Sequence, residues 1–299
     1  MMEFQYLLKR NIKLFFKDKG MFISALITPM ILLVLYATFL GKVYKDSFIQ
    51  NLPEGVTIVD SLIDGLVAGQ LMSSILAVSC VTVAFCSNLL MVQDKANGII
   101  KDFSISPVKP SRMALAYYFA SLIVTLIICY TATLLCLGYV AICGWYMSLG
   151  EIFLLILDVF ILVMFGTALS SVIHFFLSTQ GQMSAVGTII SSIYGFLCGA
   201  YMPISQFPVG LQKVLTILPG TYGTSLIRNH SMQGVFDEML KQNFPENIIE
   251  TMKDVVDCNI SLFGKNVSIP IMYVILISTI IVLITVYVLL NKFKKRRIK

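Results

Sequence analysis

Two ionisable side chains, Asp158 and His174, lie inside an otherwise apolar stretch, residues 152–177. Carboxylates and imidazoles are the side chains that transfer protons most readily, and such groups in apolar segments are functional candidates. They lie 16 residues apart, so on one helix they point roughly 160° away from each other. They therefore form no pair within that helix, and we expect each to have an ordinary polar partner.

The seven cysteines indicate neither a metal site nor a redox motif. Six lie in apolar runs, Cys258 lies in a polar segment, and no Cys-x-x-Cys pair occurs. Buried cysteine mostly behaves as a small apolar side chain. We expect no metal on this chain.

A phosphate-binding loop of the form Gly-x-x-x-x-Gly-Lys-Ser/Thr is absent. The pairs Gly41-Lys42 and Gly264-Lys265 are followed by Val and Asn instead of a hydroxyl residue. If ATP drives this protein, a separate ATPase polypeptide must hold the ATP and Mg. We therefore expect no cofactor on this chain.

The amino-acid composition indicates the class of protein, and therefore the kind of structural element that positions the residues above. Of the 299 residues, 57% are hydrophobic and 13% are charged, and the mean hydropathy is +0.85. Soluble proteins carry about 25% charged residues, which excludes a soluble enzyme. The net charge of +6 rests on too few Lys and Arg for a nucleic-acid-binding face. The sequence predicts an all-α membrane protein with one transmembrane domain over residues 1–299.

Six apolar segments are each long enough to cross a bilayer, which takes about 20 residues. They cover residues 21–40, 66–92, 113–143, 152–177, 183–201 and 269–290. Fifteen of the 22 Lys and Arg fall within residues 1–20, 94–113 and 291–299. Positively charged loops stay in the cytoplasm. We expect a multi-pass protein of a bacterial plasma membrane, with six spans and both termini in the cytoplasm.

Residues 3–19 are predicted to form an amphipathic helix that lies in the membrane interface. Phe4, Leu8, Ile12 and Phe15 repeat at helical spacing, while the basic residues between them point elsewhere. The helix is either a lipid-bound anchor or a lever that also contacts a cytoplasmic partner.

Residues 94–112 form a charged cytoplasmic loop around a short apolar stretch, 99–105, which Ser106-Pro107 closes. These apolar side chains need a cover, which is the inner leaflet, the protein's own helix ends or another protein. We favour a protein partner.

Residues 199–228 contain three prolines within a stretch too interrupted to span. Irregular backbone at membrane depth is tolerated where it is buried in protein or lines a wet cavity. We expect residues 202–228 to form a re-entrant helical hairpin, with Arg228 at its exit near the lipid headgroups. A plain external loop is the alternative. Residues 229–268 would then form a polar external insert.

The fifth apolar segment carries small residues at a spacing of four. They are Gly187, Ser191, Gly195 and Gly199. Such a stripe lets another helix approach closely, so we expect a tight neighbour in the same chain or in a second copy.

The second apolar segment is polar for its position. It includes Ser73, Ser74, Thr82 and Asn88. These side chains either hydrogen-bond between helices or face a transport pathway.

Three groups of residues resemble the permease subunit of an ABC-2 type exporter. The first group is Arg10 ahead of Lys17-Asp18, with Pro29 in the first span. The second group, in the charged loop, is Asp94, Gly98, Phe103 and Ser106-Pro107. The third group is the most specific and consists of Gly199, Pro203, Pro208, Leu211, Leu218-Pro219 and Arg228. The family usually has Glu and a Gly-Thr pair in the loop, where this chain has Asp94 and Gly98-Ile99.

The resemblance implies six spans, an N-terminal interfacial helix and a re-entrant hairpin before the last span. It also implies a pair of permeases, identical or homologous, on a pair of ABC ATPase subunits. The implied ATPase-coupling residues are Asp94, Gly98, Ile100, Phe103 and Pro107, and the implied outer gate is Gly199, Pro203, Pro208, Pro219 and Arg228. The substrate would pass between the copies along the second and fifth spans.

The polar insert after Arg228 is longer than in the polysaccharide-exporting members of the family that the chain resembles. The resemblance therefore implies a hydrophobic or amphipathic substrate, namely a drug, an antimicrobial peptide or a lipid-like molecule. An ion-coupled secondary transporter or channel is the alternative function. It predicts activity without an ATPase and sensitivity to Asp158→Asn.

Overall fold

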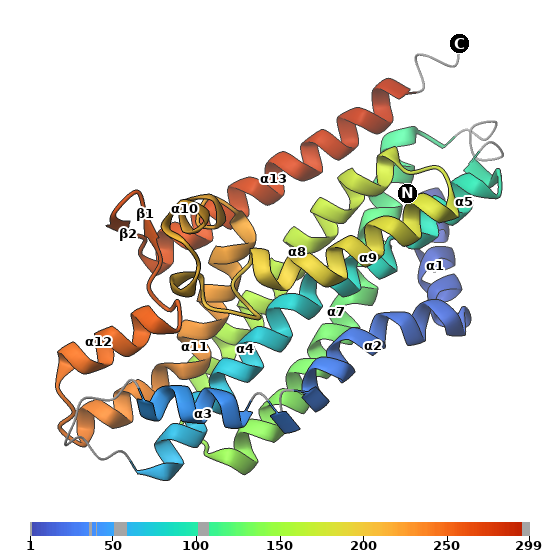
Figure 1. Cartoon of the computed structure of the whole chain (residues 1–299). Coiled ribbons are helices and arrows are strands. Elements are labelled where there is room, and N and C mark those ends of the chain that lie inside the picture. Colours follow the sequence, from blue (N-terminus) through green and yellow to red (C-terminus); the bar gives the residue numbers. More distant parts are fainter. Residues whose placement is uncertain (1, 36–37, 40, 51–58, 101–107, 295–299) are drawn as a thin grey trace.

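The structure is a computed structural model that describes residues 2–35, 38–39, 41–50, 59–100 and 108–294. Helices make up nearly all of it (Figure 1). They are α1 (Met2–Lys17), α2 (Lys19–Leu35), α3 (Gly41–Gln50), α4 (Asp60–Ser87), α5 (Leu89–Ala96), α7 (Pro110–Cys143), α8 (Leu149–Phe176), α9 (Gln180–Leu197), the 3-10 turn η2 (Ile204–Gln206), α10 (Val209–Leu215), α11 (Pro219–Lys241), α12 (Glu246–Val255) and α13 (Ile269–Lys294). The strands β1 (Ser261–Leu262) and β2 (Lys265–Asn266) form a small antiparallel hairpin.

Among the described residues, four helical units are long and apolar enough to cross a membrane. They are α4 with α5, α7, α8 and α13. A fifth arises if α1 and α2, which are bent by 77° relative to each other, are counted as one span. The prediction of an α-helical membrane protein is confirmed.

Helix α4 is the centre of the bundle, and α7, α8, α11 and α2 pack around it. In its most apolar window 83% of the residues are buried, against 17% for α13. Helix α13 therefore lies at the periphery, where its apolar side chains are exposed to the surroundings of the protein.

Glycines allow the close approaches to α4. A Cβ atom on Gly166 of α8 would lie 2.8 Å from the carbonyl oxygen of Cys80, and one on Gly69 of α4 would lie 3.0 Å from that of Ser231. Membrane helices associate through packing rather than through the hydrophobic effect, so small residues belong at such crossings.

Two capping boxes fix where α8 and α9 begin. Ser148 and Glu151 exchange side-chain-to-backbone hydrogen bonds at the start of α8, and Thr179 and Gln182 do the same at the start of α9. Each satisfies N–H groups that the first helical turn leaves without a partner.

The bundle has two ends, which Figure 1 shows on opposite sides. One carries α1, α5 and the C-terminal end of α13 and is called the α5 end below. The other carries η2, α10, α12 and the β-hairpin and is called the hairpin end.

Several predicted boundaries differ from the helices observed. The predicted span 66–92 corresponds to α4 and α5, which together extend from Asp60 to Ala96. The predicted span 183–201 corresponds to α9, which ends at Leu197 because Gly199 adopts a positive φ of 73°. The predicted boundary between hairpin and insert at Arg228 falls in the middle of α11, which runs without interruption from Pro219 to Lys241. The predicted span 21–40 extends into residues outside those that the structure describes.

Candidate functional site

At the α5 end, Asp94 joins three helices. Its two carboxylate oxygens accept hydrogen bonds from Nη1 and Nη2 of Arg10 on α1, at 2.7 and 3.1 Å. Tyr117 of α7 donates a further hydrogen bond from its hydroxyl. Asp94 is only 3% exposed. A carboxylate with a two-pronged arginine partner is held in both position and orientation.

The next residue, Lys95, ties the same helix end to α8. Its Nζ donates to the carbonyl oxygens of His174, Phe175 and Leu177, at 2.8, 2.7 and 3.2 Å. These carbonyls lie at the C-terminal end of α8, where the last carbonyl groups have no partner one turn further along the helix, and a cation is favoured at that end of the helix dipole. Adjacent residues thus attach the end of α5 to α1, α7 and α8.

The chain turns sharply immediately after this anchor. Gly98 has a positive φ of 77°, and among the described residues no atom outside its neighbours lies within 4 Å of a Cβ placed there. Ile99 and Ile100 are helical and half-buried. Glycine is the residue that adopts this conformation without strain.

The expected ATPase-coupling residues therefore divide into two groups. Asp94 was expected in the coupling loop 94–112, but it belongs to α5, and its buried carboxylate accepts hydrogen bonds from Arg10 and Tyr117. Gly98 and Ile100 lie at the accessible turn. Phe103 and Pro107 lie outside the described residues.

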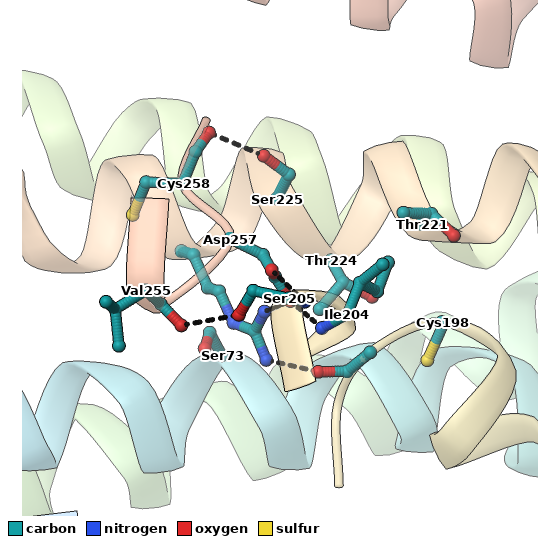
Figure 2. Close-up of polar contacts among 12 residues, drawn as sticks. Ser73, Cys198, Ile204, Ser205, Thr221, Thr224, Ser225, Val255, Asp257 and Cys258 are labelled. Atoms are coloured by element: carbon teal, nitrogen blue, oxygen red, sulfur yellow. Dashed lines mark hydrogen bonds and ion pairs between the residues drawn. The ribbon is translucent and has the colours of Figure 1, made fainter. Parts of the chain in front are cut away.

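At the hairpin end, Arg228 is the centre of a second buried cluster. Its Nη1 lies 3.1 Å from Oδ2 of Asp257, and its Nη2 donates to the carbonyl oxygen of Gly199. The same Oδ2 accepts the backbone N–H of Ile204 at 2.6 Å. Figure 2 shows Asp257, Ile204 and Ser205 gathered between α11 and α4.

Further bonds hold the segment around Asp257 against α11 and the turn at η2. Ser225 donates to the carbonyl oxygen of Cys258 at 2.8 Å, and the Asn229 amide donates to the same oxygen at 2.7 Å. Ser205 donates to the carbonyl oxygen of Val255 (Figure 2). These bonds therefore hold the polar segment around Asp257 against the predicted re-entrant hairpin, 202–228, and against α11.

The expected position of Arg228 near lipid headgroups is wrong. The residue is 1% exposed, because a carboxylate 29 residues further along the chain neutralises it. Burial raises the pKa of the Asp257 carboxyl above its ordinary value, and the positive charge of Arg228 offsets part of that shift. Removing one member of such a pair leaves a buried charge without compensation.

Glycine and proline shape the turns of this region. A Cβ on Gly199 would lie 2.9 Å from Ile204 and 3.2 Å from Asp257, so the position needs glycine for space as well as for its positive φ. Pro203 and Pro208 immediately precede η2 and α10, and Pro219 is the first residue of α11. Proline is favoured at such starts, since its fixed φ suits a helix.

In the described part of the chain, the small-residue stripe does not face a single helix. A Cβ on Gly187 would have none of the described atoms within 4 Å, whereas one on Gly195 would collide with the ring of Tyr201. Gly199 lies beyond the end of α9. The tight glycine crossings belong to α4 and α8 instead.

The four polar residues of the second segment are buried within the chain at 0–1% exposure. Asn88 donates to the hydroxyls of Ser170 and Ser171 at 2.8 and 3.0 Å and accepts from Ser121 at 2.8 Å, so it joins α7 and α8. Thr82 and Ser73 donate to carbonyl oxygens of their own helix, and Ser74 has no partner among the described residues. Asn88 thus serves packing in this arrangement.

Asp158 has partners that the sequence did not indicate. Its carboxylate lies 2.6 Å from Nδ1 of His230 on α11 and accepts a hydrogen bond from the hydroxyl of Tyr273 on α13. His174 lies apart, with its Nδ1 2.8 Å from the carbonyl oxygen of Ser170. Among the described residues, no group of three His, Cys, Asp or Glu is placed to hold a metal ion.

The sequence carried one signal for the partners it missed. An arginine in an apolar, interrupted stretch needs a carboxylate, and the six acidic residues of 229–268 were the candidates. Nothing in the local spacing distinguished Asp257 among them. Lys95 and Tyr117 gave no signal, because their partners lie on other helices.

Comparison with known proteins places these features in a family. The family model described as ABC-2 type transporter matches residues 2–230. No curated protein matches the chain. The match includes the cluster at the α5 end and extends through Arg228, while Asp257, α12 and α13 lie beyond it.

Domains of this family are transmembrane components rather than catalytic ones, and they usually work with an ABC ATPase partner. The matched region covers well over half of the chain. The chain therefore belongs to the ABC-2 type transporter family, as a membrane permease component of an ABC transporter.

Proposed function

We propose that this chain is the permease subunit of an ATP-driven exporter that moves a hydrophobic or amphipathic substrate across a bacterial plasma membrane. A separate pair of ABC ATPase subunits, which bind the ATP and Mg, powers it from the cytoplasmic side. Two permeases, identical or homologous, form the membrane part.

The anchored end of α5 carries this proposal. Asp94 and Lys95 attach it to α1, α7 and α8, and the accessible turn at Gly98 follows directly. A force applied at Ile100 by a cytoplasmic partner would therefore reach three helices at once. The basic character of the α5 end supports its cytoplasmic placement.

A six-span arrangement with both termini in the cytoplasm is part of the proposal. The spans are α2, α4 with α5, α7, α8, α9 and α13. The bend of 77° between α1 and α2 supports an interfacial α1, since a helix at that angle to a span lies close to the membrane plane.

The contacts of α11 support a re-entrant hairpin. Near its start, Gly223 lies against Leu162, halfway along α8. Later in the helix, Gly234 lies against Tyr146 and Glu151, at the beginning of α8. Helix α11 thus begins at the depth of the spans and leaves at the hairpin end.

Helix α9 supports a second permease copy. The open position at Gly187 adjoins exposed apolar side chains, with Ile189 54% and Ile193 46% exposed. A small residue between exposed apolar ones suits a helix of another subunit.

The ATPase contact is tested by purifying the tagged chain from its native membranes in mild detergent. We expect an ABC ATPase with a phosphate-binding loop to co-purify. Ile100→Asp should abolish the association, because it places a charge in the apolar contact. Phe263→Asp, the same kind of change at an exposed residue of the hairpin end, is the control. Equal ATPase recovery with both variants would refute the contact.

An ion-coupled transporter is the second candidate, and the buried Asp158–His230–Tyr273 cluster favours it. Ionisable groups within membrane spans commonly mark proton or ion pathways. Under this alternative, transport persists without an ATPase and Asp158→Asn abolishes it. Under the exporter proposal, transport of the same substrate stops when the ATPase is removed.

A further inference from the structure

A cavity of about 670 Å³ opens at the hairpin end, between α10 and the segment from Asp254 to Asn266. Its walls include Ile204, Ser205 and Asp257, which belong to the cluster around Arg228. A volume of this size accommodates a small organic molecule or a lipid headgroup. A bound molecule would therefore touch residues that hold the predicted re-entrant hairpin, 202–228, against the segment around Asp257.

One acid in the walls, Asp254, offers an anionic partner to a cation. Residues 229–268 carry six acidic residues and three lysines, although the whole chain has a net charge of +6. Within the walls, Arg228 neutralises Asp257. Asp254 accepts a hydrogen bond from the amide of Asn259 at 2.8 Å, an uncharged partner. Among the described residues of the walls, Lys213 is the one cation; it is exposed on α10, and a lysine side chain is long enough to extend its ammonium group into solvent.

The cavity also has an apolar side. Ile204 and Ile260 are buried in its walls, while Val209 and Phe263 are 67% and 77% exposed. Large apolar side chains exposed together beside a polar hollow are typical of binding sites. An aromatic ring such as that of Phe263 also attracts a cation to its face.

We propose that this cavity binds amphipathic primary amines. The ammonium group bonds to Asp254, and the apolar chain lies against Val209 and Phe263. This chemistry has two sources, a phosphatidylethanolamine of the surrounding leaflet and a soluble cationic amphiphile. The site does not depend on the proposed export function, since its binding is measured without ATP or an ATPase.

A fluorescence titration tests the site. The protein carries Phe263→Trp as reporter and Trp145→Phe to remove the native tryptophan, and it is held in phosphatidylcholine nanodiscs. Octylammonium, octanol and octanoate share one tail and differ in headgroup. We expect a saturable response to octylammonium at a concentration at least about fivefold lower than to octanol, and none to octanoate.

Three variants in this background locate the interaction. Asp254→Asn keeps an oxygen for Asn259 but removes the charge, and should weaken octylammonium binding about tenfold. Asp237→Asn, the same change at an acid outside the cavity that bonds Gln233, should leave binding unchanged. Lys213→Gln should tighten binding severalfold, an effect that misfolding cannot produce.

Equal responses to the three amphiphiles, or equal binding by Asp254→Asn and Asp237→Asn, would overturn the proposal. Replacing part of the phosphatidylcholine with phosphatidylethanolamine distinguishes the two sources. Displacement of octylammonium identifies the lipid as the occupant, and unchanged affinity identifies a soluble amphiphile.

Discussion

Asp94 shows how one buried carboxylate can hold a junction of helices. An isolated charge at 3% exposure would be costly. Here Arg10 supplies the opposite charge and two N–H donors, while Tyr117 supplies a hydroxyl. The carboxylate fixes α1 against the end of α5 because each of its oxygens is engaged by a donor from another helix.

A double-mutant cycle of Arg10→Gln and Asp94→Asn should measure this bond. We expect a coupling free energy of about 1.5–3 kcal/mol, since hydrogen bonds to charged groups fall in that range. The value should lie toward the lower end, because the Arg10 side chain remains 29% exposed. Unfolding in mixed micelles gives the free energies.

The exposed pair Lys241–Glu238, with side chains 72% and 32% exposed, is the control and should show under about 1 kcal/mol. If the Arg10–Asp94 pair coupled no more strongly than this control, its role as an anchor would be refuted.

Asp257 predicts a pH dependence of stability. Its folded pKa is raised by burial, so the folded protein binds this proton more tightly than the unfolded chain does. Its stabilising contribution is therefore full below the unfolded value of about 3.9 and is lost as the pH rises through the raised folded value. The Asp257→Asn variant has no carboxyl group at this position, so its stability lacks this pH-dependent contribution.

Between these two pKa values, the unfolding free energy of the wild type should fall with rising pH more steeply than that of Asp257→Asn. Thermal unfolding of both proteins between pH 4 and pH 7 measures the difference. A difference that stays constant over this range would contradict the raised pKa.

Helix packing around α4 depends on particular glycines rather than on a periodic stripe. Gly166→Ala should destabilise the crossing of α8 with α4 by about 1–3 kcal/mol, because the added methyl group meets the backbone of Cys80 and Val81. Gly187→Ala should be neutral or stabilising by up to about 1 kcal/mol, since its position is open and alanine favours a helix. Measured unfolding free energies that are equal for Gly166→Ala and Gly187→Ala would contradict this packing.

The helices of the bundle are largely predictable from the sequence, whereas their partners are not. Hydropathy is local, and it located α7, α8 and α13 within a few residues of their observed ends. The small-residue stripe predicted a tight neighbour for α9, but close approach depends on what lies opposite a glycine. Gly187 faces open space, whereas Gly166 faces the backbone of another helix. The spacing of residues along one helix does not reveal this difference.

Helix α4 connects the two clusters of the molecule. It has 28 residues, which corresponds to a length of about 42 Å. Toward the hairpin end, Gly69 accepts a hydrogen bond from Ser231 of α11. Toward the α5 end, Asn88 bonds to α7 and α8. A displacement of α5 would therefore reach α11 through a single helix.

The candidate site was predictable only in part for the same physical reason. Glycine and proline act on their own backbone, so Gly199, Pro203, Pro208 and Pro219 could be assigned to turns and helix starts from the sequence. Buried charges act through space, so the pairing of Arg228 with Asp257 required the fold.

The most direct test of the central claim is transport in proteoliposomes that contain the purified chain with or without its co-purifying ABC ATPase. Export of an amphipathic fluorescent amine would be followed with ATP, without ATP, and with ionophores that collapse every ion gradient. We predict transport only when both the ATPase and ATP are present, with no loss on adding ionophores. Transport by the chain alone, driven by an ion gradient and abolished by Asp158→Asn, would contradict the account.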